Sequence, residues 1–247
     1  MNRIETIITE CVNWIRKYFE ETCGEKAVIG ISGGKDSTVA AALCVEALGA
    51  ENVIGVMMPN GYQSDIEDAH KIVEHLGIEW YCIDIYYPFN DIINEITIFA
   101  DLEISNQTKI NLAPRLRMTT LYAIAQSCNG RVCNTCNYSE DYVGYSTLYG
   151  DLAGDFSPLG KLFVSDIIEI GDFLGLPKEL VHKTPSDGLC GLTDEDNLGF
   201  TYDELECYIR GDKNCEHSEL IEKKNNVSRF KREMIKIPTF DPYSIFK

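Results

Sequence analysis

The sequence predicts an α/β protein, with a doubly wound, mostly parallel sheet and helices on both faces. Short apolar runs alternate along the chain with segments of helical periodicity, which is typical of such sheets. The first of these runs leads through a glycine-rich turn directly into a long helix-forming segment. With 247 residues and ordinary apolar content, the chain is long enough for one sizeable core, so we expect a single domain over residues 1–247.

The individual elements follow from hydrophobic periodicity. A leading helix at 4–20 carries one apolar stripe, and charged residues fill a helical tail at about 213–236. Further helices are predicted at 36–48, 64–76, 111–127 and 164–175, and strands at 27–31, 53–58, 80–85 and 131–133. Because ligands bind beyond the carboxyl ends of parallel strands, we expect the site in the loops after Ile31, Met58 and Cys133.

Net charge and the lack of long apolar runs exclude several functions. A formal charge of −17 argues against a nucleic-acid-binding face, which requires clustered lysine and arginine. Basic side chains focused in one cleft could still hold a small anion. Since no apolar run could span a bilayer and the start of the chain is unlike a signal peptide, we expect a cytoplasmic protein without membrane contact.

Ten cysteines are scattered through the chain, which indicates reduced thiols rather than a disulfide framework. Only Cys133 and Cys136 have the close spacing of metal ligands. A structural zinc site needs a second such pair, which the later cysteines do not supply. The question of a metal at Cys133 and Cys136 stays open on the sequence alone.

The stretch from Val28 to Ser37 reads V-I-G-I-S-G-G-K-D-S. Exposed backbone N–H groups and the positive end of a helix dipole favour an anion at such a turn, and Gly33 and Gly34 allow close approach. It is not a Walker A loop, because Lys35 precedes Asp36 rather than Ser or Thr. The dinucleotide fingerprint is excluded by its glycine spacing.

The remaining pattern, S-G-G-x-D-S, resembles the pyrophosphate loop of the N-type ATP pyrophosphatases, which have the adenine nucleotide alpha-hydrolase-like fold. These enzymes split ATP between the α and β phosphates to adenylate a substrate. The resemblance implies an ATP-binding loop made of Gly30, Ile31, Ser32, Gly33, Gly34, Lys35, Asp36 and Ser37. It also implies that Asp36 is catalytic and binds Mg²⁺.

Asn111 to Met118 reads N-L-A-P-R-L-R-M and resembles the N-x-x-A-R-x-R-M signature of NAD synthetases. Pro114 replaces the usual alanine, near the first turn of the expected helix, where proline is tolerated. The resemblance implies that Arg117 and Arg115 contact the dinucleotide substrate, deamido-NAD. The alternative is a pair of surface arginines.

Asn134 to Glu140 reads N-T-C-N-Y-S-E and is similar to the G-T-x-N-x-S-E pattern of the same family. By resemblance, Thr135 binds ATP, while Glu140 is catalytic and joins Asp36 on magnesium, an ion that prefers carboxylate and phosphate oxygens. Asn134 stands where glycine is usual, and asparagine tolerates left-handed backbone angles. A glutamate at a helix start is the structural alternative for Glu140.

Asp155 lies at the family's position for a substrate-binding aspartate, in a loop rich in Gly, Asp and Tyr. The sequence departs from the family at two lysines. Leu148 replaces one expected at the nucleotide substrate, and Val164 replaces one expected at the ATP phosphates. We hypothesise that Lys35 and Lys161 compensate for these losses.

The segment from Lys183 to Tyr202 follows the family's K-x-P-S-A-G-L pattern and its continuation, in which Ser186 matches an ATP contact. Its acidic cluster at residues 194–196 has the composition of a solvated helix start, so we leave it out of the site. Near the C-terminus, Phe230-Lys231-Arg232 resembles the family's H-K-R, which implies a substrate contact for Lys231. An ordinary basic surface patch is the alternative.

The motifs run from Gly30 to Arg232 in order, so the resemblance to ammonia-dependent NAD synthetases covers nearly the whole chain. It implies a ligase that makes NAD from deamido-NAD, ATP and ammonia through an acyl adenylate, releasing AMP and pyrophosphate. It also implies a homodimer with ammonia as the nitrogen donor, supplied free or by a separate amidase. No cysteine or serine arrangement requires a covalent intermediate.

Two other functions remain open. One is a tRNA-thiolating ATP pyrophosphatase that uses Cys133 and Cys136, against which the acidity of the chain counts. The other is a non-catalytic nucleotide-binding module of the same fold.

Overall fold

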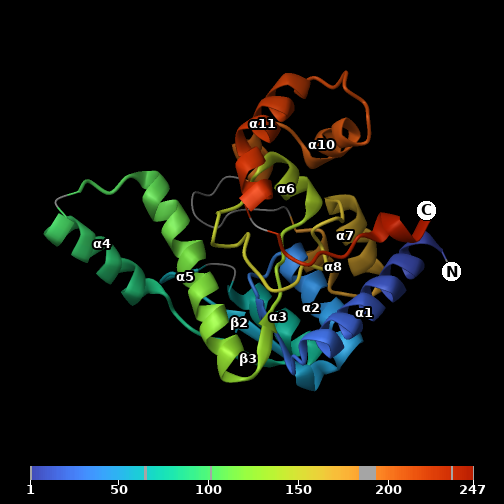
Figure 1. Ribbon diagram of the computed structural model, residues 1–247, viewed down its shortest axis with the longest axis horizontal. Helices are drawn as coiled ribbons and strands as arrows, with labels where there is room; N and C mark the ends of the chain where they lie inside the picture. Colours follow the sequence, from blue (N-terminus) through green and yellow to red (C-terminus); the bar gives the residue numbers. More distant parts are fainter. Residues whose placement is uncertain (1, 64–65, 101, 184–192, 235, 247) are drawn as a thin grey trace.

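The protein is built on a four-stranded parallel sheet with helices on both faces, as predicted (Figure 1). The computed structural model describes residues 2–63, 66–100, 102–183, 193–234 and 236–246. The strands are β1 (Lys26–Gly30), β2 (Val53–Met57), β3 (Glu79–Cys82) and β4 (Gly130–Val132), in the order β3-β2-β1-β4.

Strand β1 lies inside the sheet and pairs with β2 on one side and with β4 on the other. Ala27 is in register with Val53 on one side and with Arg131 on the other. The connections after β1 and β4 therefore diverge at the carboxyl edge of the sheet. This is the topological switch point where parallel sheets hold ligands.

One face of the sheet is covered by five helices. They are α1 (Arg3–Thr22), α2 (Lys35–Leu48), α3 (Ile66–Leu76), α7 (Val164–Phe173) and α8 (Lys178–Val181). The apolar stripe predicted for the leading helix is buried in this layer, with Ile7, Cys11 and Ile15 fully enclosed. Asn2 and Glu5 form a capping box that fixes the start of α1.

The opposite face is covered by α5 (Asn106–Ser127). Successive residues of β1 point to opposite faces, so Val28 contacts this layer while Ile29 belongs to the other. Ala113 and Ala125 of α5 bring the helix close to the sheet.

Helix α5 begins five residues earlier than predicted, because Ser105 caps it: its Oγ accepts a hydrogen bond from the N–H of Thr108 at 3.1 Å. Pro114 therefore lies in the third turn, not near the first as expected, and lacks the N–H that would bond to the carbonyl of Ile110. Gly150 lies against it, since a Cβ there would be 2.9 Å from the Pro114 Cβ.

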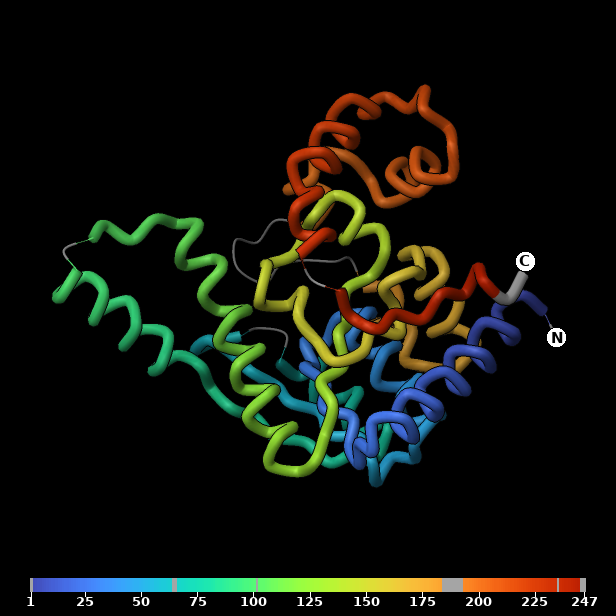
Figure 2. The backbone as a smooth tube through the Cα atoms, in the orientation of Figure 1, coloured from blue at the N-terminus to red at the C-terminus, as the bar shows by residue number. Residues whose placement is uncertain are grey.

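Helix α4 (Tyr86–Ala100) was not predicted. Together with the first turns of α5 it projects from the body as a two-helix arm (Figure 2). None of its described residues is buried, although the helix is rich in apolar side chains.

Four helices form a lobe beside the carboxyl edge of the sheet, with a small apolar core of their own. They are α6 (Tyr138–Val143), α9 (Asp194–Leu198), α10 (Tyr202–Ile209) and α11 (Ser218–Met234). Helix α11 is the predicted charged tail. The 3-10 turns η1 (Ala50–Asn52) and η2 (Pro242–Phe246) complete the chain, and η2 returns to α1 so that the two termini lie together (Figure 1).

Candidate functional site

The loop after β1 is held in shape by its own serines. Gly33 has a φ of 81°, which only glycine adopts without cost, and Gly34 is the N-cap of α2. The Oγ of Ser32 accepts a hydrogen bond from the N–H of Gly34 at 3.2 Å, and the Oγ of Ser37 donates to the Gly34 carbonyl at 3.1 Å. The turn is therefore held by hydrogen bonds within the chain.

The start of α2 is open to an anion. Among the described residues, no side chain caps it. The first N–H groups of a helix have no partner within the helix, and the helix dipole places positive charge beside them. The geometry of this loop thus fits a phosphate group.

Lys35 and Asp36 form an ion pair at the first turn of α2. The Lys35 side chain is only 3% exposed, and its Nζ lies 3.3 Å from Oδ2 of Asp36. It also lies 5.5 Å from the centre of the Tyr202 ring. Burial alone would lower the pKa of Lys35, but the charges of Asp36 and Glu140 raise it overall, so the amine stays charged.

Asn137 connects Asp36 to Glu140, the two predicted magnesium ligands. Its Nδ2 donates to Oδ1 of Asp36 at 2.9 Å, and its Oδ1 accepts from the N–H of Glu140 at 3.0 Å. The Glu140 carboxylate in turn accepts from the backbone N–H of Asn137, which completes a capping box for α6. Glu140 therefore fits both readings, since it stabilises a helix start and faces Asp36.

Negative charge is concentrated between these carboxylates. Burial, and next the charge of Asp36, raise the pKa of Glu140 well above its ordinary value. In the described part of the chain, no three His, Cys, Asp or Glu side chains are grouped as a complete metal cage. Two carboxylates with phosphate oxygens and water are the usual set for Mg²⁺, so the residues present fit this ion.

The turn after β4 is held by Asn134 in a way the sequence did not indicate. Asn134 is not among the described residues with positive φ, so its tolerance of left-handed angles is not used. Instead Nδ2 donates to the carbonyls of Asp151 and Ala153, and Oδ1 accepts from the N–H of Cys136. Thr135 is half-buried in the same turn.

Cys133 and Cys136 lie in different environments. Cys133 is in the core with Cys44 and Cys11, and the Sγ of Cys136 donates to the carbonyl of Asp151 at 3.3 Å. Burial raises the pKa of both thiols, which favours their protonated form.

Both carboxylate oxygens of Asp155 have protein partners. Oδ1 accepts from the hydroxyl of Tyr122 at 3.2 Å and Oδ2 from the N–H of Val132 at 2.8 Å. In the structure Asp155 fastens the predicted substrate loop to strand β4.

Arg115 and Arg117 point in different directions from α5, as two residues two apart must. Arg117 is half-buried and donates from Nε to the carbonyl of Met58, at the end of β2, at 3.0 Å. Arg115 is exposed and donates to the carbonyl of Leu148 at 3.2 Å. Burial lowers the pKa of Arg117, which the carboxylate of Asp151 partly offsets.

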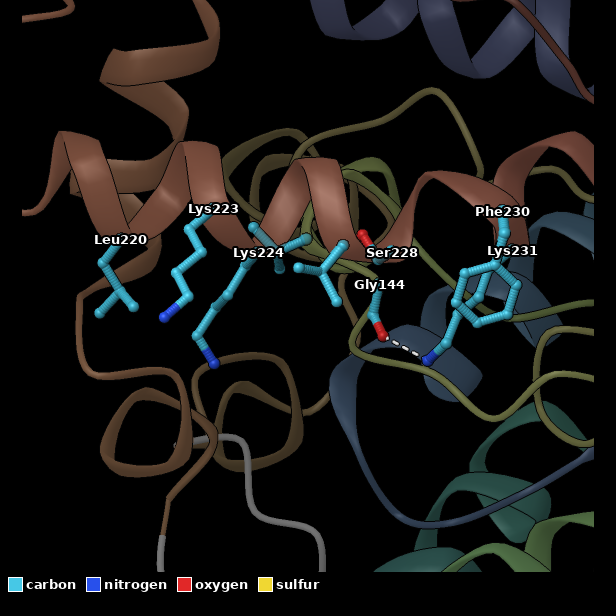
Figure 3. Close-up of a pocket in the computed structure, with 9 residues that line it drawn as sticks. Gly144, Leu220, Lys223, Lys224, Ser228, Phe230 and Lys231 are labelled. Atoms are coloured by element: carbon cyan, nitrogen blue, oxygen red, sulfur yellow. Dashed lines mark hydrogen bonds between the residues drawn. The ribbon is translucent and has the colours of Figure 1, made fainter.

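Lys231 lies where α11 meets the loop after α6. Its Nζ donates to the carbonyl of Gly144 at 2.7 Å (Figure 3). It also donates to the carbonyl of Ser146. A pocket of about 310 Å³ opens along this side of α11, lined by Lys223, Lys224 and Phe230 among others. Lys231 and Phe230 therefore lie beside the loop that contains Leu148.

The two candidate replacement lysines differ in their surroundings. Lys35 is beside Asp36 in the loop, whereas Lys161 lies with its Nζ 5.1 Å from the centre of the Tyr138 ring, on the side of Arg229 and Arg232. Val164 is a buried core residue of the helical lobe, in the same cluster as Tyr202. Lys35 is thus the lysine that the structure places at the phosphate loop.

Asn137, Asp194 and Tyr202 are site residues that the sequence analysis did not assign. Asp194 was expected at a solvated helix start but is buried, and it accepts hydrogen bonds from Tyr145 and Tyr202. The family pattern contains all three positions. Their proximity to the buried Lys35, which would have assigned them to the site, is visible only in the folded structure. Ser186 lies outside the described residues.

The fold and site define a class of protein: a parallel α/β nucleotide-binding domain with an anion loop and an acidic pair at its switch point. The family model for NAD synthase matches residues 7–239. The chain belongs to the NAD synthase family.

Relatives agree with this assignment. The NH(3)-dependent NAD(+) synthetase of Finegoldia magna is 38% identical over 94% of this chain and 95% of its own. Among solved structures, the NMN synthetase of Francisella tularensis superposes with a TM-score of 0.87 at 36% identity, covering 96% of this chain and 99% of that one. The NH3-dependent NAD synthetase of Campylobacter jejuni gives 0.79 at 27% identity, with the same coverage.

Proposed function

We propose that this chain is an ammonia-dependent carbon–nitrogen ligase that makes NAD from deamido-NAD, ATP and ammonia. The observation that carries the proposal is the anion loop whose Asp36 is joined through Asn137 to Glu140, in a member of the NAD synthase family. The nicotinate carboxylate attacks the α-phosphorus of ATP, and the bond to the β-phosphate oxygen breaks. Ammonia then attacks the acyl carbon, loses a proton, and AMP leaves.

ATP is assigned to the loop from Gly30 to Ser37, with Thr135 and Ser186 as further contacts. The N–H groups at the start of α2 bind the departing pyrophosphate, and the charge of Lys35 neutralises it. Rate enhancement comes from positioning and charge neutralisation rather than from a covalent intermediate.

We assign Asp36 and Glu140 as the ligands of a magnesium ion. Bound there, Mg²⁺ would neutralise phosphate charge and orient the α-phosphate. Asn137 contacts both carboxylates, that of Asp36 through Nδ2 and that of Glu140 through its backbone N–H, and Lys35 supplies a further positive charge at the loop.

Deamido-NAD is assigned to Arg117, Arg115, Lys231 and Asp155. Arg115 and Lys231 donate to carbonyls of the same short loop, those of Leu148 and of Gly144 and Ser146, so they approach it from two helices. Arg117 sits at the end of β2 on the same edge of the sheet. Asp155 would support substrate binding by holding its loop to β4, in addition to any direct contact with deamido-NAD.

The test is a pyrophosphate-release assay with deamido-NAD, ATP, Mg²⁺ and ammonium, omitting each component in turn. We expect pyrophosphate only with ATP, Mg²⁺ and deamido-NAD together, and NAD only when ammonium is added. NAD formation at an equal rate from glutamine, without ammonium or a partner protein, would contradict the proposal. Release of pyrophosphate without deamido-NAD would contradict the assigned acceptor.

A second acceptor, nicotinate mononucleotide, is favoured by one observation. Leu148 and Phe230 stand where the family pattern has a lysine and a histidine at the dinucleotide; Leu148 lies in the loop that Arg115 contacts, and Phe230 lines a pocket with Gly144 and Lys231. A smaller substrate, which lacks the AMP half, needs fewer contacts, and an NMN synthetase is among the similar structures. A kcat/KM for the mononucleotide more than about tenfold above that for deamido-NAD, or ~1.4 kcal/mol, would establish it.

We further propose that the enzyme is a homodimer. Large apolar side chains are exposed on the arm and the adjacent strand β3, including Tyr87 at 73%, Ile98 at 69% and Phe99 at 78%. Large exposed apolar side chains in such number on one element favour an interaction site. A second copy of the chain is the partner that we assign to it.

The cellular setting follows from the same features. The cysteines of the described residues are all free thiols, as in a reducing compartment, and we place the enzyme in the cytoplasm. Among the helices that the structure describes, none is both long and apolar enough to cross a bilayer. Its ammonia comes from solution or from a separately encoded amidase.

A further inference from the structure

We propose that Lys35 competes with the magnesium ion for Asp36, so that its ammonium occupies the acidic site until a metal–nucleotide complex displaces it toward the phosphates. The inference rests on the proposed metal assignment to Asp36 and Glu140. It gives Lys35 a role in the order of binding, beyond simple contact with ATP.

The position of Lys35 is costly without an anion. Its side chain is 3% exposed and begins at the first residue of α2, where the helix dipole disfavours positive charge. A buried ammonium is tolerated only when paired. Oδ2 of Asp36 at 3.3 Å and the face of the Tyr202 ring at 5.5 Å provide that pairing.

Asp36 has both oxygens in use. Oδ1 accepts from the Asn137 amide at 2.9 Å, and Oδ2 faces Lys35. Each carboxylate oxygen can accept a second partner, so a cation could bind Asp36 beside the ammonium, but the two positive charges would then lie close together. Two positive charges at one carboxylate oxygen repel each other, so metal binding and the Lys35–Asp36 ion pair disfavour each other.

Phosphates give the displaced ammonium an anion in addition to Glu140 and Asp194, whose charges already act on it. Lys35 directly follows the Ser32–Gly34 turn, which is shaped for a phosphate group. Val164, at the place of the family's other phosphate lysine, is buried among apolar side chains. Metal alone therefore has to displace a paired ammonium, whereas nucleotide phosphates supply new negative charge for both cations. Binding of the two is cooperative.

The test is a titration of MgCl₂ without nucleotide, followed by thermal unfolding and by calorimetry, on the wild type and on Lys35→Met. We expect the midpoint for Mg²⁺ to fall at least about tenfold in Lys35→Met, because the competing charge is gone. ATP affinity in the presence of Mg²⁺ should fall in the same variant. Lys213→Met is the matched control, since Lys213 also lies over a tyrosine ring, that of Tyr208, but on α10, and its Mg²⁺ midpoint should not change.

An unchanged or weakened response of Lys35→Met to Mg²⁺ would overturn the proposal. If Lys35 served only as a structural counter-ion, the variant would lose stability without rescue by Mg²⁺. Should Lys35→Met fail to fold, Lys35→Gln carries the same measurement, because its amide can still donate to Asp36. The titration needs no turnover, so the identity of the acyl acceptor does not affect its outcome.

Discussion

Asn137 shows how one side chain serves both a helix and a reaction centre. It is fully buried, caps α6 and orients Asp36 with the same amide group. The two roles need different atoms: Oδ1 accepts for the cap, and Nδ2 donates to the carboxylate. Substitutions can therefore separate them.

We predict that Asn137→Asp folds normally but is impaired in catalysis. Aspartate is as good an N-cap as asparagine, yet it cannot donate to Asp36 and adds a like charge beside it. Pyrophosphate release should fall at least about tenfold in kcat/KM, with little change in the midpoint of thermal unfolding. Asn137→Ala, the comparison, should lose about 1–2 kcal/mol of stability as well. Full activity in Asn137→Asp would show that the amide bond to Asp36 is dispensable.

At the scale of single residues, the sequence identified the functional motifs but not the hydrogen-bond partners of their residues. The resemblance singled out Asp36 and Glu140, which the fold brings together through Asn137 from loops about a hundred positions apart. The role of Asn134 was misjudged, because its hydrogen bonds go to carbonyls of the loop at residues 151–153. Partners so distant along the chain leave no local signal.

The contact between α6 and α11 positions Lys231, the residue that the helical lobe contributes to the candidate site. Gly144 ends α6 with a φ of 68°, and a Cβ there would lie 2.1 Å from the Cβ of Ser228 on α11. Arg232 strengthens the contact by donating to the carbonyls of Asp141 and Tyr142. Lys231 is delivered to its loop by this packing.

We predict that Gly144→Ala destabilises the protein and weakens binding of the acyl acceptor. The left-handed backbone costs about 1 kcal/mol, and the clash with Ser228 brings the total to roughly 2–4 kcal/mol. KM for deamido-NAD should rise while KM for ATP stays near the wild-type value, since the phosphate loop lies elsewhere. Gly175→Ala is the control: its φ is 70°, but nothing lies within 4 Å of the added carbon. It should cost only about 1 kcal/mol and leave both KM values unchanged. Equal effects of the two substitutions would refute the packing argument.

Elements buried on one face were predictable, whereas the arm was not. The stripe of α1 and the apolar runs of the strands follow the periodicity of core packing, and α2 is buried on nearly all sides. Helix α4 is apolar without a buried face of its own, so its sequence does not distinguish helix from loop in the same way. Its exposed apolar side chains would be buried only in contact with a partner.

On the scale of the whole molecule, the apolar arm contrasts with a strongly acidic chain of net charge −17. Self-repulsion at this charge opposes non-specific association, so a dimer requires a specific apolar interface. A stable interface buries roughly 800 Å² on each partner. The exposed aromatic and aliphatic side chains of α4 and β3 would supply a large apolar part of such an interface.

We therefore predict that the double substitution Ile98→Asp and Phe99→Asp converts the protein to a monomer. Both side chains are more than two-thirds exposed within one chain, so the fold should persist while the interface gains buried charge. Light scattering after size-exclusion chromatography should give half the wild-type mass, and circular dichroism should be unchanged. Phe173→Asp, on α7 and 49% exposed, tests whether any exposed aromatic has this effect, and it should remain dimeric. A wild-type mass equal to one chain would show that the protein is not a dimer. A double variant that stays dimeric would place the interface elsewhere. If the monomer also loses NAD formation while its ATP affinity persists, the partner subunit completes the acceptor site, because the arm continues into the helix that carries Arg115 and Arg117.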